Sequence, residues 1–127
     1  MTFPHRAAEA GAVVQDPVAL EKLREIDPDG ILVRKWIHGF LNEAPGRLRG
    51  MKSATEAEIF PAVVAAAHSL KNVAGWLGGE RFWMVCQALE LAARHASQEE
   101  CRSHLRILRQ ELPLFEACLK TYLDASV

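Results

Sequence analysis

Residues 101–122, CRSHLRILRQELPLFEACLKTY, decide the fold class of this chain of 127 residues. Apolar side chains recur there in steps of four and three: Cys101, Leu105, Leu108, Leu112, Phe115, Leu119 and Tyr122. This spacing aligns them on one face of an α-helix, in the positions that form a packed seam between helices. The segment therefore predicts a long helix with one buried face, and we expect a bend at Pro113.

The preceding segments also have helical spacing, and none alternates with the period of two that is typical of strands. The expected helices span residues 16–26, 31–51, 61–77 and 80–95. Asp16 is a suitable N-cap and Pro17 a suitable first residue for the short first helix, whereas Pro45 should kink or divide the second. Residues 52–60 are expected to be a connection. The pattern predicts an all-α fold, an antiparallel four-helix bundle with a short additional N-terminal helix over one end.

Composition limits the classes of function. Half of the residues are hydrophobic and the net charge is −1, so neither nucleic acid nor an anionic membrane is an expected partner. We expect residues 1–14 to be a flexible leader or linker remnant and residues 15–127 to form one domain. The leader has no signal-peptide pattern. The odd number of cysteines, without a C-x-x-C pair, indicates reduced core residues and a cytoplasmic location.

Residues 62–82, AVVAAAHSLKNVAGWLGGERF, place a histidine on the outer face of a mostly apolar helix. With about 100° per residue, His68 lies about 160° from the buried direction set by Leu70, and Lys71 lies beside it. A lone surface histidine usually has no function. Here three glycines, Gly75, Gly78 and Gly79, lower helix stability. We expect that cost where another protein must approach the imidazole closely. Positive charge and clearance together indicate a phosphorylated histidine that another protein approaches.

Residues 65–78, AAAHSLKNVAGWLG, resemble the signature of histidine phosphotransfer (HPt) domains, A-H-x-L-K-G-x-x-x-x-x-G. His68, Leu70, Lys71 and Gly78 match the signature, whereas Asn72 stands where glycine is usual. The segments 16–26, 32–51 and 88–94 are also similar to the corresponding segments of the family, so the resemblance covers about residues 15–123.

The resemblance implies a phosphoryl carrier in a multistep phosphorelay. Such a domain takes the group from the aspartate of one receiver domain and passes it to the aspartate of another, without ATP or kinase activity of its own. It would be either free-standing or the terminal domain of a hybrid sensor histidine kinase. No cofactor or metal site is expected in this chain, because Mg²⁺ and the acidic pocket would come from the response-regulator receiver.

The resemblance also implies roles for individual residues. His68 would be the phosphoacceptor through Nε2, and Lys71 would offset the charge of the phosphoryl oxygens. The other ring nitrogen, Nδ1, needs an acceptor, for which Glu90 is the candidate and Gln87 the alternative. A small, weak docking surface on a monomer is expected, formed by Val64, Asn72, Gly75, Gly78, Gly79 and Trp83, with Arg94 at its rim.

Two other classes of protein were weighed against the carrier. A non-catalytic helical adaptor would retain the fold for receiver or partner binding only, and Asn72 is the residue that favours it. A metal-binding bundle would need inward carboxylates and E-x-x-H motifs, which the sequence lacks.

Overall fold

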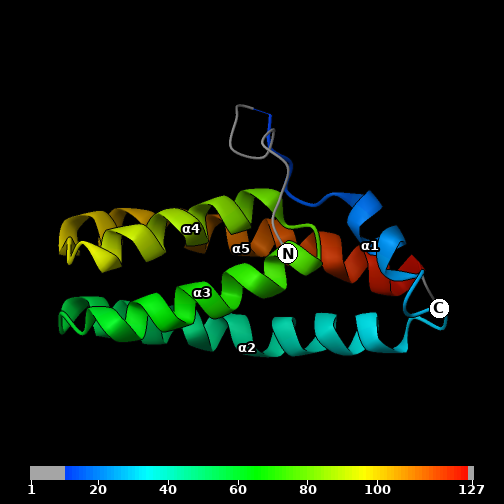
Figure 1. Ribbon diagram of the computed structural model, residues 1–127, viewed down its shortest axis with the longest axis horizontal. Helices are drawn as coiled ribbons and strands as arrows, with labels where there is room; N and C mark the ends of the chain where they lie inside the picture. Colours follow the sequence, from blue (N-terminus) through cyan, green and yellow to red (C-terminus); the bar gives the residue numbers. More distant parts are fainter. Residues whose placement is uncertain (1–10, 126–127) are drawn as a thin grey trace.

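The computed structural model describes residues 11–125, which form five α-helices. Their bounds are α1 Pro17–Leu23, α2 Ile31–Glu56, α3 Phe60–Trp76, α4 Glu80–Arg94 and α5 Gln98–Ala125. The helices α2 to α5 run antiparallel in a bundle, and α1 lies at one end (Figure 1). No strand occurs between residues 11 and 125. The predicted all-α bundle with a short N-terminal helix is therefore confirmed.

The two helices that contain proline are longer and more continuous than the sequence suggested. Neither Pro45 nor Pro113 divides its helix, and α2 continues to Glu56, so the predicted connection at 52–60 was wrong over its first half. The stripe of buried residues explains the extension, because Thr55 follows Met51 by four residues and is fully buried. Packing on both sides of each proline retains the helix despite the hydrogen bond that proline removes.

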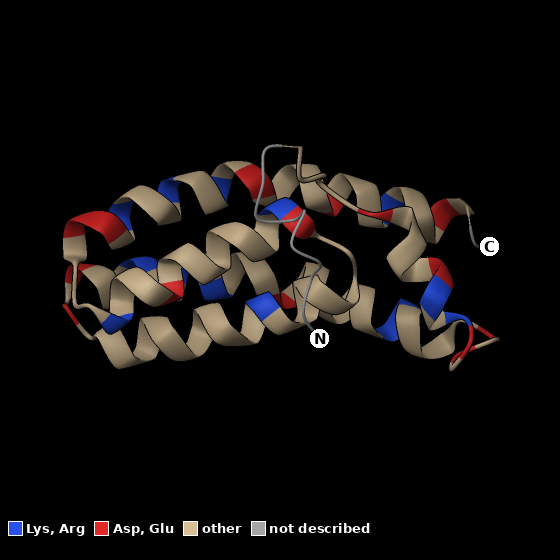
Figure 2. Cartoon of the chain, turned by 45° about the horizontal axis from the view of Figure 1, so that its top comes forward, with Lys and Arg blue, Asp and Glu red and all other residues tan. Residues whose placement is uncertain are grey.

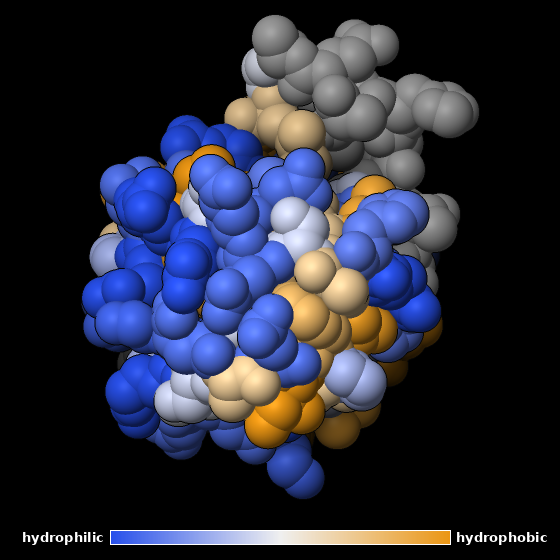
Figure 3. Space-filling view, turned by 90° about the vertical axis from the view of Figure 1, so that its left-hand side faces the viewer, coloured by the Kyte–Doolittle hydropathy of each residue, from blue (hydrophilic) through white to orange (hydrophobic). Residues whose placement is uncertain are grey.

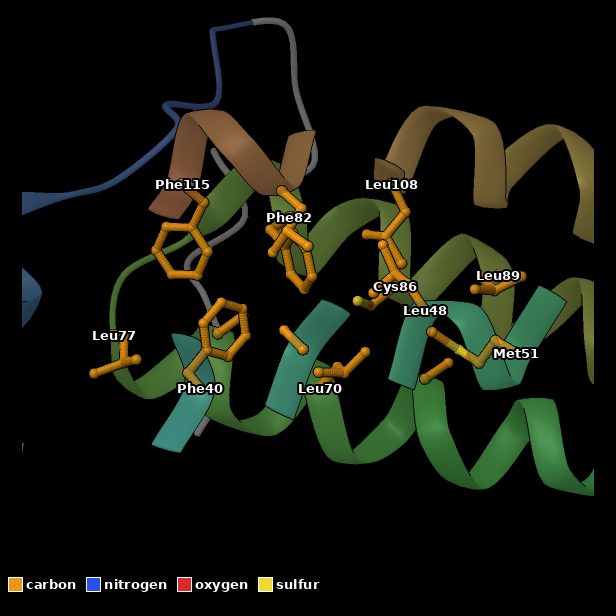
Figure 4. Close-up of a cluster of buried hydrophobic side chains, with 14 of the residues drawn as sticks. Phe40, Leu48, Met51, Leu70, Leu77, Phe82, Cys86, Leu89, Leu108 and Phe115 are labelled. Carbon is orange, nitrogen blue, oxygen red and sulfur yellow. The ribbon is translucent and has the colours of Figure 1, made fainter. Parts of the chain in front are cut away.

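An aromatic cluster forms one part of the core. Phe40 of α2, Phe82 of α4 and Phe115 of α5 have ring centroids 5.2–5.7 Å apart (Figure 4). From α3 the core receives mainly small residues, such as Ala67 and Ala74, so α3 packs closely and most extensively against α4. The bundle order is therefore α2 beside α3, α3 beside α4, α4 beside α5 and α5 beside α2.

The segment before α1 is held to the bundle by its backbone. The Val13 amide donates to the Glu80 carboxylate at 3.2 Å, and the Arg81 amide donates to the Val13 carbonyl at 3.0 Å. Val14 packs against the core. Residues 13 and 14 were predicted to belong to a flexible leader, and this was wrong, because hydrogen bonding to α4 leaves no periodic signal in the sequence. Residues 1–10 lie outside the described residues.

The helix α1 begins as predicted. Asp16 accepts a hydrogen bond from the Val18 amide at 3.0 Å and Pro17 is the first helical residue. Its helical geometry ends at Leu23, three residues before the predicted end. The Asp16 amide in turn donates to the Gly78 carbonyl at 2.8 Å, which ties the start of α1 to the turn between α3 and α4.

That turn needs both of its glycines for internal reasons. Gly78 has a φ of +77°, and a Cβ there would lie 2.8 Å from the Cβ of Ala19. A Cβ on Gly79 would lie 2.5 Å from the ring of Phe115. The prediction that these glycines give room to a partner was therefore wrong in its reason, because the chain's own α1 and α5 fill the space.

We expect Gly79→Ala to lower the free energy of unfolding by about 1–3 kcal/mol, since the methyl group would overlap a fully buried ring. Urea titration followed by circular dichroism measures this change. Gly50→Ala is the matched control, because Gly50 lies in α2 with open space around it. That control should gain up to about 1 kcal/mol. Equal stability of the Gly79 variant and the wild type would contradict the packing described here.

Candidate functional site

His68 lies at the middle of α3 with its ring partly in solvent. Its side chain is 54% exposed, while its neighbours Ala67 and Leu70 are buried. Small and apolar residues on the inner face of α3 thus pack the helix against the bundle and leave the imidazole outside. This is the orientation that the helical angles predicted.

Glu90 of α4 contacts the imidazole. Its Oε1 lies 3.3 Å from Nδ1 of His68, and its side chain is only 8% exposed. Since a carboxylate only accepts hydrogen bonds, Nδ1 must carry the proton that is shared. The lone pair of the neutral ring is then on Nε2, the other ring nitrogen. The structure thus brings together the two residues that were paired from the sequence.

Lys71 is held against α4 rather than extended into solvent. Its Nζ lies 3.0 Å from the same Oε1 of Glu90 and donates to Oε1 of Gln87 at 2.8 Å. The side chain is 14% exposed, with Nζ 5.9 Å from the centroid of the Trp83 ring. Gln87 was the alternative partner of the imidazole. It orients Lys71 instead, because it lies level with Lys71 on the facing helix.

Arg94 uses the second oxygen of the same carboxylate. It lies one turn after Glu90 on α4 and donates to Oε2 from two nitrogens, at 2.8 and 3.3 Å. Its side chain is 56% exposed. The sequence reasoning treated Arg94 only as a rim residue, although the spacing of four residues between Glu90 and Arg94 is the usual signal of such a pair.

These contacts change the acidity of Glu90. Burial alone raises the pKa of this carboxyl, but the hydrogen bonds from Arg94, Lys71 and His68 outweigh burial and lower the pKa to about 2. Glu90 is therefore ionised at neutral pH. Two cations, Lys71 and Arg94, and one anion, Glu90, lie beside the imidazole, so the side chains around it have an excess of one positive charge, which favours a negatively charged group on His68.

The residues predicted to form the docking surface are not all accessible. Asn72 is exposed, and Val64 and Trp83 are half-buried. Gly75, Gly78 and Gly79 are buried. The accessible part of the predicted docking surface is therefore the imidazole and Asn72, and the half-buried side chains of Val64 and Trp83 flank it.

An apolar groove between α2 and α3 was missed by the sequence reasoning. It has a volume of about 510 Å³, and Trp36 and Trp76 meet in it with ring centroids 6.2 Å apart. Trp76 is 42% exposed. By helical angle Asn72 lies between His68 and Trp76 on the surface of α3, so Trp76 places one edge of the groove two turns along α3 from the imidazole. A large aromatic residue outside the buried stripe of α3 was the available signal.

All three cysteines are free thiols. Cys86 and Cys101 are buried, as expected of core residues, and burial raises the pKa of both thiols, whereas Cys118 is only half-buried.

Within residues 11–125, no three His, Cys, Asp or Glu side chains are grouped so that they could hold a metal ion. No helix in the same range is long and apolar enough to cross a membrane.

An outward histidine on a helical bundle, hydrogen-bonded to a carboxylate and flanked by two cations, is the arrangement expected of a phosphocarrier protein. Residues 35–125 match the family model described as Hpt domain, and the chain belongs to this family. Among solved structures, histidine-containing phosphotransfer protein B (HptB) from Pseudomonas aeruginosa PAO1 superimposes with a TM-score of 0.78. The match covers 90% of this chain and 96% of that chain at 22% identity, so it shows a common fold. A search of curated proteins finds no match.

Membership in this family gives the chain its general role. It is a histidine phosphotransfer module of a phosphorelay, a carrier of phosphoryl groups rather than a kinase. Domains of this family interact with receiver domains in phosphorelays.

The lowered pKa of Glu90 predicts a pH dependence of stability. A carboxyl whose pKa falls from 4.5 in the unfolded chain to about 2 in the folded one stabilises the fold above pH 4.5. That contribution, up to about 3 kcal/mol, is lost as the pH falls from about 4.5 to 2. We expect Glu90→Gln to be less stable than the wild type at pH 6 and equally stable near pH 2.

Urea unfolding at several values between pH 2 and pH 6 measures this difference. Glu43→Gln is the control, because Glu43 forms an exposed pair with Arg47 at 3.6 Å and should change stability little at any pH. A deficit of the Glu90 variant that stayed constant over the whole range would contradict the assigned ionisation.

Proposed function

We propose that His68 accepts a phosphoryl group from the aspartyl phosphate of one receiver domain and returns it to the aspartate of another. The observation that carries the proposal is the contact of 3.3 Å between Nδ1 and Glu90 on a ring that is 54% exposed. It leaves the nucleophilic nitrogen free and directed away from α4.

The transfer step follows from this geometry. The Nε2 lone pair attacks phosphorus, an N–P bond forms, and the bond between phosphorus and the aspartyl oxygen breaks to release a carboxylate. The ring gains positive charge as the bond forms, and Glu90 stabilises it through Nδ1–H. The reverse sequence passes the group to the next receiver. In this proposal Mg²⁺ is supplied by the receiver, and no ATP takes part.

Lys71 and Arg94 provide the positive charge near the transferred group. Lys71 is fixed by Glu90 and Gln87, so its charge acts in place without reorganisation. Arg94 is more exposed and its guanidinium has further donors beyond those bound to Glu90. We assign Lys71 to charge stabilisation and Arg94 to the edge of the receiver contact.

The receiver would cover more than the imidazole. From His68 the exposed surface continues over Asn72 to Trp76 and the apolar groove, which offers the hydrophobic area that a specific contact needs. We therefore place the receiver over His68, Asn72 and Trp76. Asn72, in place of the glycine of the family signature, lies at the centre of this surface and is suited to adjusting the fit to a particular partner.

The context of the domain is part of the proposal. We propose a monomeric carrier in the cytoplasm, where its three free cysteines stay reduced. It would act either as a free-standing shuttle or as the terminal domain of a hybrid sensor histidine kinase. Both arrangements need the same surface to be accessible to receivers.

We expect incubation with a phosphorylated receiver to give this chain acid-labile, base-stable phosphate, and His68→Gln to abolish it. His104→Gln is the control, since His104 lies on α5, and it should accept phosphate as the wild type does. Label that persists in the His68 variant would remove His68 from the role. A wild type that binds the receiver without being labelled would instead indicate an adaptor.

The docking surface predicts the effect of Trp76→Ala. Loss of an exposed indole at the contact should weaken receiver binding about tenfold and leave the fold intact. Titration calorimetry with the unphosphorylated receiver measures the affinity. Ile107→Ala on α5 is matched in exposure, at 43%, and should bind like the wild type. Equal affinities of the two variants would place the receiver elsewhere on the surface.

A further inference from the structure

The face formed by α2 and α5 carries a concentration of positive charge that phosphotransfer does not use. Arg49 and Lys52 of α2 and Arg106 and Arg109 of α5 are exposed along it, and we call these four residues the basic cluster. Figure 2 marks the charged residues along the helices. Because α2 adjoins α5 while His68 lies on the α3–α4 side, the basic cluster is on the opposite side of the bundle.

The basic cluster is not neutralised within the chain. Over residues 11–125 no ion pair engages Arg49, Lys52, Arg106 or Arg109. Lys52 does act on Glu56, whose pKa is lowered mainly by the hydrogen bond from Arg102 and also by the charge of Lys52. The nearby Arg102 differs, because Glu56 binds it through both carboxylate oxygens, at 3.0 and 2.6 Å. The chain as a whole has a net charge of −1, so four unpaired cations on one face are a marked asymmetry.

The cluster borders a groove with an apolar floor. Two adjoining hollows, of about 180 and 420 Å³, share Lys52 and Arg109 in their walls. The first hollow is lined by charged residues, among them the Glu56 carboxylate, and Leu105 is the one apolar residue of its lining. The second is lined by Pro45, Leu48, Leu112 and Pro113. Apolar side chains of a ligand would therefore find contacts between the cations.

The surface away from the groove differs in character. Figure 3 views the molecule from the end that carries the α2–α3 and α4–α5 turns. It shows hydrophilic residues over one side and a hydrophobic band over the other.

We propose that the groove between α2 and α5 binds an acidic amphipathic segment of a partner protein. Arg106 and Arg109, which form no ion pair in the described chain, are three residues apart on α5 and make a stripe about 5 Å long. Carboxylates with the same spacing on a helix would match the stripe, and apolar residues between them would meet the floor. The apolar floor favours such a segment over a nucleic acid backbone, whose charged phosphates and polar sugars offer no large apolar side chain to bury.

This inference goes beyond phosphotransfer and does not depend on it. A partner in this groove would leave His68 and Trp76 uncovered, so the carrier could be held by one protein while it exchanges phosphoryl groups with another. Binding to the groove should therefore be the same for the His68→Gln variant and the wild type.

The test uses the full chain and a fluorescent synthetic peptide in which Glu recurs in steps of four and three beside Leu. We expect anisotropy to show binding at low salt that weakens as salt screens the charges. Arg106→Glu with Arg109→Glu should reduce the affinity at least tenfold. The milder pair Arg106→Gln with Arg109→Gln should give a smaller loss in the same direction.

The control carries the same change of charge elsewhere. Lys22→Glu with Lys120→Glu alters two exposed lysines outside the groove and should bind the peptide nearly as the wild type does. The proposal is overturned if the peptide does not bind at low salt. It is also overturned if Arg106→Glu with Arg109→Glu and the control Lys22→Glu with Lys120→Glu lose affinity equally. Tighter binding to a short DNA duplex or to phosphatidylserine vesicles than to the peptide would also overturn it.

Discussion

The site depends on one carboxylate that joins two helices. The Glu90 side chain extends from α4 towards α3, and its two oxygens accept hydrogen bonds from His68, Lys71 and Arg94. A buried charge without partners would destabilise the fold, so this arrangement exists only because every side of the carboxylate is occupied. The contacts of Glu90 with His68 and Lys71 also tie α3 to α4, in addition to the apolar packing between these helices. Orientation of the imidazole and packing of the helices are therefore one property of the structure.

The site separates a fixed part from an accessible part. Lys71 is nearly buried and held by two acceptors, whereas the imidazole is half in solvent and held at one nitrogen. A carrier must accept and release its cargo with similar ease, which excludes a deep pocket closed around the phosphoryl group. Charge that is preorganised below the surface stabilises the group without enclosing it. The receiver then completes the site and supplies what the carrier lacks.

Sequence reasoning predicted the elements well because the buried stripes of α3, α4 and α5 are strongly periodic. The outward direction of His68 followed from the angle alone, and the likeness to HPt domains supplied Glu90 as its partner. Periodicity does not give the axial offset between two neighbouring helices, so it could not show that Gln87 of α4 lies opposite Lys71 of α3. It also could not show that Phe115 occupies the space beside Gly79, since these residues are far apart in sequence.

The position of the basic cluster on the far side of the bundle limits what its charges do. Two helices of about 10 Å diameter separate the α2–α5 surface from the α3–α4 surface, and salt screens charges over about 8 Å at physiological ionic strength. Arg106 and Arg109 therefore contribute little to the potential at His68. Their mutual repulsion is a small cost to the fold, because like charges one helical turn apart destabilise a helix by a few tenths of a kcal/mol. Arg49, Arg106 and Arg109 repel one another and form no ion pair within the described chain, which favours an external anionic partner, and the apolar side chains of the groove favour a partner with side chains to bury.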